Sequence, residues 1–161
     1  MIFVTVGTHE QQFNRLVKAM DDLVANGTIT EPVFEQTGYS TYVPEHCEHS
    51  QFVPAQRMQE LMSEASVVIT HGGPSSFVEA MTAGRAPVVV PRRAEFGEHV
   101  NDHQADFVRI VAERIGGIVP VFDVGELPQA IAKAREMTSG EAFKSHNTEF
   151  CSELSRLIEG L

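Results

Sequence analysis

The sequence is poor in cysteine and in basic residues. Its only cysteines are Cys47 and Cys151, and their separation suits neither a disulfide framework nor a metal or redox motif, as expected in a reducing compartment. Twelve basic residues against 22 acidic ones give a formal net charge of −10, which argues against a general nucleic-acid or anionic-membrane surface. We therefore expect a cytoplasmic protein with no nucleic-acid partner, in which any bound phosphate is held by local contacts.

Long apolar runs are also missing. No segment approaches the roughly 18 apolar residues of a membrane span, and residues 1–7 lack the basic start and the apolar stretch of a signal peptide. The length of 161 residues is enough for one domain with a full core and too short for two domains of ordinary size. The sequence predicts one domain that is either soluble or attached to a membrane through a partner.

Apolar segments of strand length alternate with helical patterns over residues 1–137. The alternation predicts a Rossmann-like, doubly wound α/β fold with a parallel sheet of about six strands. The expected strands cover residues 2–6, 32–38, 51–53, 67–71, 87–91 and 117–121. Residues 138–161 are expected to form a C-terminal helical extension of the same domain, with an apolar face made of Phe150, Leu154, Leu157 and Ile158. That face either packs on the domain or meets a partner.

The most informative stretch is 67–81, where a strand pattern changes to a helix pattern across a glycine turn. Residues 67–70 are apolar or β-branched and lead into His71, which Gly72 and Gly73 follow. The two glycines allow the backbone to turn tightly, and Pro74 fits the first helical position because its missing N–H needs no partner there. A helix is therefore expected to begin at Pro74.

The start of that helix is a candidate anion site. The backbone N–H groups of Ser75, Ser76 and Phe77 have no partner within the helix, and the serine hydroxyls lie beside them, so a phosphate oxygen can bind there. Glu79 lies four residues after Ser75 on the same face, where its carboxylate can accept hydrogen bonds from the hydroxyl groups of a ribose. The alternative is a capping box formed by Ser76 and Glu79, which would serve the helix alone.

Three further groups of residues carry weaker signals. Thr8 follows the first strand at the edge where open α/β sheets bind ligands, although a threonine before a helix is also a common cap. His46, Cys47 and His49 could suggest a metal, but they are crowded and no second cluster has matching spacing. The polar loop 92–104 is a second candidate site, and its two leading arginines could either contact a leaving group or be solvated.

The spacing His71-x-Gly73-x-x-Ser76-x-x-Glu79 closely resembles the donor-binding signature of GT-B glycosyltransferases. Other motifs agree in order, and the span from the first strand to about residue 137 is similar to the C-terminal, donor-binding domain of glycosyltransferase family 28. Those motifs are Val4-Thr5-Val6-Gly7-Thr8, Gln36-Thr37-Gly38, 65–73, Glu79-Ala80 and Asp102-His103-Gln104. With 90–93 and 97–104, they most resemble the single-domain subunits of bacterial exopolysaccharide and capsule transferases, which form half of a split enzyme.

The resemblance implies which residues bind the donor, a UDP-sugar. The expected nucleotide-binding residues are Thr8, Phe52, Val53, His71, Gly72, Gly73, Ser75, Ser76 and Glu79, and the expected sugar-binding residues are Asp102, His103 and Gln104. Within this set, Gly73, Ser75 and Ser76 would hold the diphosphate. Glu79 would bind the ribose, and Phe52 with Val53 the uracil. Helix amides would neutralise the departing diphosphate, so no metal and no other cofactor is expected.

Members of the family that act alone carry an additional N-terminal domain, which binds the acceptor and supplies the general base. This sequence begins directly at the donor-binding part, so the resemblance implies a donor-binding subunit whose catalytic base lies on another subunit. The expected partners are a membrane-anchored acceptor-binding subunit and a lipid-linked saccharide at the inner face of the membrane. The expected reaction is hexosyl transfer in polysaccharide biosynthesis. The alternative is a regulatory or scaffolding subunit that binds a nucleotide-sugar without turnover of its own.

Overall fold

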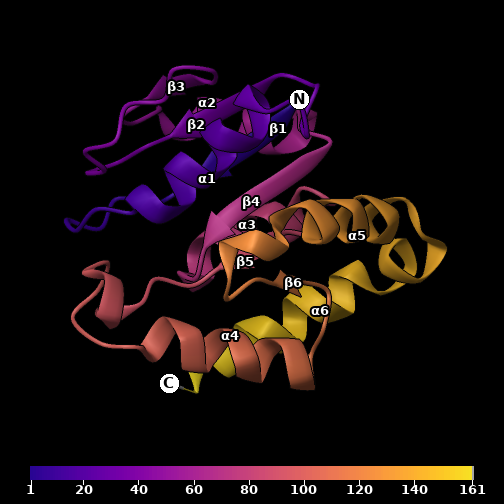
Figure 1. Cartoon of the computed structure of the whole chain (residues 1–161). Coiled ribbons are helices and arrows are strands. Elements are labelled where there is room, and N and C mark those ends of the chain that lie inside the picture. The colour runs from indigo at the N-terminus through magenta and orange to yellow at the C-terminus, as the bar shows by residue number, and fades with distance from the viewer. Residues whose placement is uncertain (161) are drawn as a thin grey trace.

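The computed structural model describes residues 1–160, except for the side chains at positions 141, 142 and 144–146. Within it, six strands form one sheet in which neighbouring strands are parallel. The strands are β1 (Ile2–Thr5), β2 (Val33–Gln36), β3 (Glu48–Ser50), β4 (Val67–His71), β5 (Val88–Val90) and β6 (Val119–Pro120). Their order is β3-β2-β1-β4-β5-β6, with β3 and β6 at opposite edges (Figure 1). This arrangement confirms the predicted doubly wound α/β fold.

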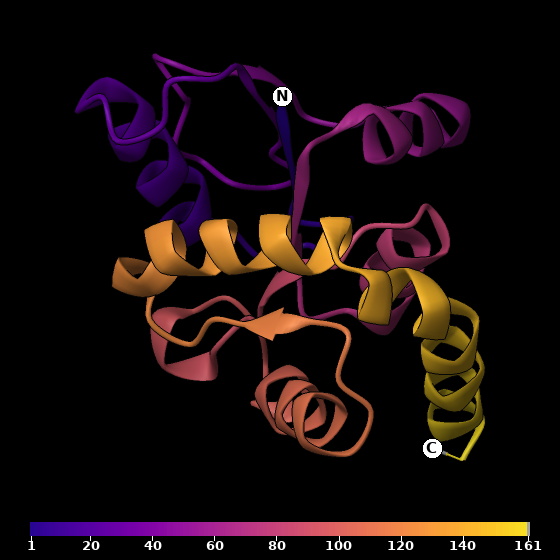
Figure 2. The ribbon, with the colours of Figure 1, turned by 90° about the vertical axis from the view of Figure 1, so that its right-hand side faces the viewer.

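Helices cover both faces of the sheet. They are α1 (Asn14–Ala25), α2 (Ala55–Glu64), α3 (Pro74–Thr82), α4 (His103–Arg114), α5 (Leu127–Ser139) and α6 (Glu141–Glu159), with the short 3-10 helices η1 (Ala94–Phe96) and η2 (Val124–Glu126). Helices α1 and α5 pack on one face, and α2, α3, α4 and α6 pack on the other. Figure 2 shows α5 lying across the strands and α6 turning away from its end. The apolar strands of the parallel sheet are thereby shielded from water on both sides.

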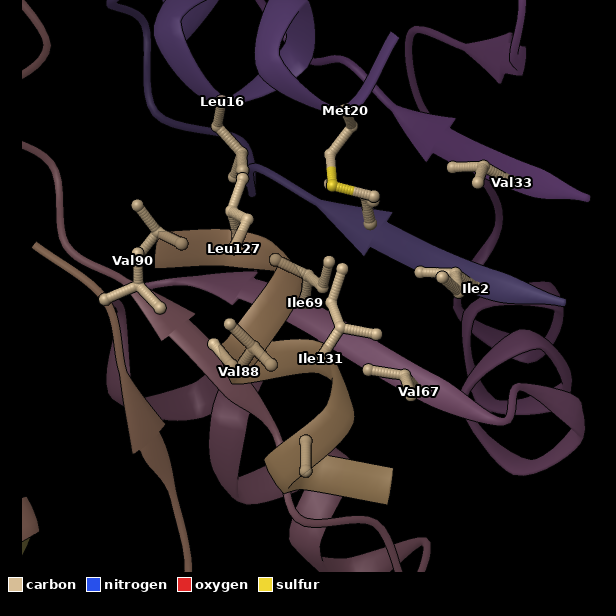
Figure 3. Packing of buried hydrophobic residues seen from close by; sticks show 14 of the residues in the cluster. Ile2, Leu16, Met20, Val33, Val67, Ile69, Val88, Val90, Leu127 and Ile131 are labelled. Atoms are coloured by element: carbon tan, nitrogen blue, oxygen red, sulfur yellow. The ribbon is translucent and has the colours of Figure 1, made fainter. Parts of the chain in front are cut away.

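Side chains along each strand alternate between the two faces. In β1, Ile2 and Val4 point toward α1 and α5, whereas Phe3 points to the opposite face and packs in the cluster of Leu61. Figure 3 shows the first face, in which side chains of α1 and α5 meet strand residues; those labelled are Ile2, Leu16, Met20, Val33, Val67, Ile69, Val88, Val90, Leu127 and Ile131. Each large apolar side chain that is fully buried in this way contributes about 1.5–3 kcal/mol to folding.

The third strand differs from the prediction. The apolar pattern predicts a strand at 51–53, but the ladder with β2 ends at Ser50. The carbonyl of Gln51 still accepts from the N–H of Gly38 at 2.9 Å, and Phe52 and Val53 then leave the sheet and lead to Pro54, the N-cap of α2. Since β3 lies at the edge of the sheet, its residues stay largely exposed, and no apolar alternation reveals it.

The sixth strand is shorter than predicted. The pattern predicts residues 117–121, whereas ladder pairing with β5 covers only Val119 and Pro120. Pro120 has no N–H to continue the ladder, although the N–H of Val121 still donates to the carbonyl of Val89 at 2.9 Å.

The apolar face of α6 packs on its own domain. Leu154 is fully buried in the cluster that contains Phe77 and Met81 of α3, and Phe150 and the other predicted apolar residues of the helix surround it. Of the two predicted alternatives for this face, packing on the domain is the one observed. Among the described residues, no helix combines the length and the hydropathy needed to cross a bilayer.

An ionisable side chain is buried on the face of the sheet covered by α1. Glu35 of β2 is 0 % exposed, and neither carboxylate oxygen has a hydrogen-bond partner among the described residues. Burial, and to a lesser extent the charge of Asp21, raise the pKa of Glu35 to about 9. The carboxyl group is therefore protonated at neutral pH.

Asp21 lies nearby in a different electrostatic environment. Burial alone would raise its pKa, but its carboxylate accepts hydrogen bonds from the hydroxyl of Tyr42 at 2.6 Å and from the N–H groups of Glu45 and His46 at 3.1 and 2.7 Å. These bonds outweigh burial and lower the pKa of Asp21 to about 2. The neighbouring Cys47 is a buried thiol. In the described part of the chain, no group of three or more histidine, cysteine or acidic side chains is arranged to hold a metal ion, and this includes the candidates His46, Cys47 and His49.

Glu35 makes the stability of the fold depend on pH. The Glu35 carboxyl group ionises near pH 4.5 in the unfolded chain and only near pH 9 in the folded one. Its contribution to the free energy of unfolding is therefore full below pH 4.5 and is lost as the pH rises toward about 9. One proton corresponds to about 1.4 kcal/mol per pH unit. We predict that Glu35→Gln, which cannot ionise, gains that amount over the wild type per unit between about pH 6 and about pH 8 in urea unfolding. A difference between the two proteins that stays constant with pH would contradict the prediction.

Candidate functional site

A cavity of about 590 Å³ opens at the carboxyl ends of the central strands β1 and β4. The sheet order reverses here, because β2 and β3 lie beyond β1 while β5 and β6 lie beyond β4. Open α/β sheets bind ligands at such a point, where the loops on the two sides separate and leave a crevice. The lining residues are Thr5, Gly7, Thr8, His9, Gln36, Phe52, Val53, Met58, His71, Ser75, Ser76 and Glu79.

Most of the predicted nucleotide-binding residues meet in this cavity: Thr8, Phe52, Val53, His71, Ser75, Ser76 and Glu79. Thr8 is not a helix cap, because the N-cap of α1 is Phe13. Gly73 forms the N-cap of α3, and Gly72 lines a neighbouring cavity of about 420 Å³ together with His103 and Gln104. Apart from Gly73 and Asp102, which line neither, the predicted nucleotide and sugar residues thus line two cavities that meet at the 72–76 turn.

Sequence reasoning about the site missed Thr5, Gly7, His9, Gln36 and Met58. Gly7 and Gln36 lie inside two motifs that carry the family resemblance, so these motifs could have identified them. Met58 has the spacing of a core residue in α2, and nothing in the sequence distinguishes it from Leu61 or Met62.

His71 ends β4 as a neutral ring. The N–H of Gly73 donates to its Nδ1 at 3.1 Å, so the ring proton lies on Nε2, which donates to Oγ of Ser76 at 3.0 Å. Burial, together with the positive charge of Arg92, lowers the pKa of His71 to about 3. Both ring nitrogens therefore shape the turn, and Ser76 keeps its own hydroxyl proton for an acceptor in the cavity.

Two glycines allow the backbone to close around the His71 ring. Gly7 follows β1 with a φ of 76°, and a Cβ atom at this position would collide with Nε2 of His71. A Cβ atom on Gly73 would collide with Cε1 of the same ring. Only glycine fits at both positions, so the loop after β1 and the turn before α3 meet at this histidine.

Helix α3 begins as predicted, with Pro74 in its first turn. No side chain caps it and Oγ of Ser76 pairs with His71, which excludes the capping-box alternative. One part of the prediction is wrong, because the N–H of Ser76 donates to the carbonyl of Gly73 at 3.2 Å and is not free. The N–H of Ser75 has no acceptor in the described part of the chain. Ser75 lines the cavity, so the positive end of the α3 dipole lies beside it.

Glu79 lines the cavity one turn further along α3. Its carboxylate forms no hydrogen bond or ion pair with any side chain in residues 1–140, and burial raises its pKa. A half-buried carboxylate with no protein partner keeps its acceptor positions available for hydroxyl groups of a ligand.

Asp102 and Gln104 hold the loop between β5 and α4. Oδ1 of Asp102 accepts from the N–H of Ala94 at 2.9 Å and lies 3.5 Å from Nε of Arg93; the first contact is the main reason that the pKa of Asp102 is lowered. Oε1 of Gln104 accepts from the N–H of Arg92 at 3.0 Å. Both side chains therefore contribute to loop structure, and of the two only Gln104 also lines a cavity.

Arg92 is neither solvated nor directed at a leaving group, so both predicted alternatives are wrong for it. The side chain is 0 % exposed, and its Nη2 donates to the carbonyl of Val6 at 2.8 Å. Its Nη1 donates to the carbonyls of Gln11, Gln12 and Glu98 at 2.8, 3.2 and 3.1 Å. Burial lowers the pKa of Arg92 to about 10, which leaves it charged at neutral pH.

A second arginine extends this network to α1. Arg15 pairs with both carboxylate oxygens of Glu98, each at 3.0 Å, and Oε1 of Glu98 also accepts from the N–H of Arg93. Because Glu98 is itself buried, the pair is shielded from solvent. The loops after β1 and β5 are thereby tied into one unit beside the cavity.

A family model, described as the glycosyltransferase family 28 C-terminal domain, matches residues 1–158. The chain belongs to this family. The match spans the cavity, the Arg92 network and nearly all of α6, so the family 28 domain includes every predicted site residue. A comparison with curated proteins found no match.

Three solved structures to which this family 28 domain is similar in fold are glycosyltransferases. The glycotransferase of kitacinnamycin is 19 % identical with a TM-score of 0.63, over 96 % of this chain and 39 % of that one. SnogD from Streptomyces nogalater is 16 % identical with a TM-score of 0.60, over 99 % and 43 %. MurG of Acinetobacter baumannii is 20 % identical with a TM-score of 0.53, over 96 % and 49 %. The likeness concerns the fold, and this chain spans less than half the length of each of these proteins.

The Arg92 network gives a testable prediction about the loops beside the cavity. Lysine has a single ammonium group and cannot reach carbonyls on both sides of the guanidinium, so Arg92→Lys leaves at least one buried carbonyl unpaired. We predict a loss of at least about 1–3 kcal/mol in the free energy of unfolding.

The matched control is Arg93→Lys at the next position, where the side chain is partly exposed and pairs with Glu95 and Asp102 at 3.5 Å. That change should stay within about 0.5 kcal/mol of the wild type. Both free energies of unfolding would be measured in urea. Equal losses in the two variants would show that the buried hydrogen bonds of Arg92 stabilise the fold no more than the partly exposed ion pairs of Arg93.

Proposed function

We propose that this family 28 domain is the donor-binding subunit of a two-component GT-B glycosyltransferase. It would bind a UDP-sugar and transfer the hexose to a lipid-linked acceptor in polysaccharide biosynthesis. The observation that supports this most is the cavity at the strand-order reversal, where the start of α3 and the free carboxylate of Glu79 face the same space.

The start of α3 suits the diphosphate of the donor. The N–H of Ser75 and the hydroxyl proton of Ser76 are both available to phosphate oxygens, at the positive end of the helix dipole. His71 contributes as a neutral donor that orients Ser76, since its low pKa excludes an imidazolium. A chain with a formal net charge of −10 holds an anion only through such directed contacts, so no metal ion is needed in this proposal.

The apolar part of the cavity lining suits the nucleoside of the donor. Phe52 and Val53 line the cavity with apolar surface, and Tyr39 packs edge-on against the Phe52 ring at 5.6 Å. Glu79 lines the same cavity as these residues and the serines, and in this proposal its carboxylate accepts from both ribose hydroxyls. Gln104 and His103 line the adjoining cavity, which supports their proposed role in binding the sugar.

The transfer step would require a second protein. The cavity opens at the sheet edge, and an acceptor hydroxyl must be brought to the anomeric carbon together with a general base. We propose that a membrane-anchored subunit supplies both at the cytoplasmic face, and that the present chain is peripheral there through that partner.

The first test is UDP binding by calorimetry. We predict that the wild type binds UDP and that Glu79→Ala weakens binding by about 1–3 kcal/mol, or roughly 5- to 150-fold in Kd, because two hydrogen bonds to a charged acceptor are lost. The matched control is Glu113→Ala, an exposed glutamate of α4 outside both cavities, which should leave Kd unchanged. A Glu79→Ala variant with lower thermal stability but wild-type UDP affinity would refute the ribose role.

The second test concerns turnover. We predict that the purified chain binds the UDP-sugar yet transfers almost no sugar to a lipid-linked acceptor until the acceptor-binding subunit is added, because proximity can supply up to about 7–11 kcal/mol of the barrier reduction. Transfer would be followed with a radiolabelled donor. Efficient transfer by the isolated chain would contradict the two-component proposal, and donor binding without transfer in the presence of the partner would favour a regulatory subunit.

A further inference from the structure

The side chain of Gln36 lines the cavity of about 590 Å³ and is 1 % exposed. Its Oε1 accepts from the hydroxyl of Thr5 at 2.6 Å and from the N–H of Gly7 at 3.2 Å. Its Nε2 donates to the carbonyl of Gly7 at 3.1 Å and to the carbonyl of Gln51 at 2.7 Å. These bonds use both acceptor positions and both donors of the amide, so its orientation is fixed.

The contacts of Gln36 join two loops that the sheet does not join. Gly7 leads into Thr8 and Gln51 leads into Phe52, and both Thr8 and Phe52 line the cavity. We refer to these two loops as the two walls of the cavity. Strand β2 lies between β1 and β3, so the loops that follow β1 and β3 share no ladder hydrogen bond. The amide of Gln36, at the end of β2, spans both.

We propose that Gln36 is a positioning residue that sets the distance between the two walls of the donor site. The Gly7 loop packs against the His71 ring, which bonds Ser76 at the proposed diphosphate end, and the Gln51 loop carries Phe52 at the proposed base end. The Gln36 amide therefore helps to set the span available to a nucleoside diphosphate. The identity of this ligand rests on the proposed function. The geometric role does not, because the hydrogen bonds exist without a ligand.

Only an amide satisfies all of these partners. Methionine has a similar shape but removes the partner of the Gly7 carbonyl and of the Thr5 hydroxyl. It would leave the Gly7 N–H only its 3.3 Å bond to Oγ1 of Thr5, and the Gln51 carbonyl only its 2.9 Å bond from the N–H of Gly38. A glutamate carboxylate can still accept from Thr5 and Gly7, but it presents an acceptor to the carbonyl of Gln51. When protonated, the same side chain regains one O–H donor for that carbonyl.

The test compares Gln36→Met with Val33→Ala, a core change on the same strand that lies outside the cavity. We expect Gln36→Met to raise the Kd for UDP at least about tenfold and to lower the hydrogen-exchange protection of the Gly7 amide, which keeps only its bond to Thr5, while amides of β4 stay protected. Val33→Ala should lower the melting temperature but keep both the Kd and the Gly7 protection. Equal UDP affinity in the two variants, or unchanged Gly7 protection in Gln36→Met, would overturn the proposal.

A pH series of Gln36→Glu gives an independent readout that also serves if Gln36→Met does not fold. The ratio of its Kd for UDP to that of the wild type should shrink as the pH is lowered, because protonation restores a donor to Gln51. A ratio that does not change with pH would count against the proposal. If the wild type fails to bind UDP, the proposed function fails, whereas Gly7 hydrogen exchange still decides the role of Gln36.

Discussion

The buried guanidinium of Arg92 is the interaction on which the ligand edge of this domain depends. A fully buried charge is stable only when it is paired, and its partners here are carbonyls of Val6, Gln11 and Glu98, with the ring of Phe13 at 4.9 Å. The first two carbonyls follow β1 and the third follows β5. Loops from the two halves of the sheet therefore share one cation, and neither can move without leaving charge or carbonyls unpaired.

The same principle shapes the cavity itself. His71 and Gln36 are buried polar side chains whose donors and acceptors are all engaged, the first with Gly73 and Ser76 and the second with the loops on both sides. Fully satisfied polar groups in a low-dielectric setting hold a single geometry. Of the groups left over, the Ser76 hydroxyl is oriented by its bond to His71, and the Glu79 carboxylate lines the same cavity.

Sequence patterns predicted the fold wherever strands are covered on both faces. β1, β4 and β5 are continuous apolar runs for that reason, and the glycines and proline of the 72–74 turn have local conformational consequences that sequence reveals directly. β3 was misplaced because an edge strand needs no apolar alternation, whereas the apolar Phe52 and Val53 line the cavity, and Val53 also packs against the core. The burial of Arg92 and Gln36 was not predicted, because the sequence around a polar residue at the end of a strand is the same whether its side chain is solvated or buried. Only the residues that surround it in the fold determine which of the two occurs.

Both edges of the sheet are short. β3 has three residues, of which Glu48 and His49 are exposed, and β6 has two and ends at a proline. Such edges offer too few consecutive free N–H and carbonyl groups to template a strand from another chain. Association by β-augmentation is thereby disfavoured, so a second protein that contacts this domain must recognise side chains and loops.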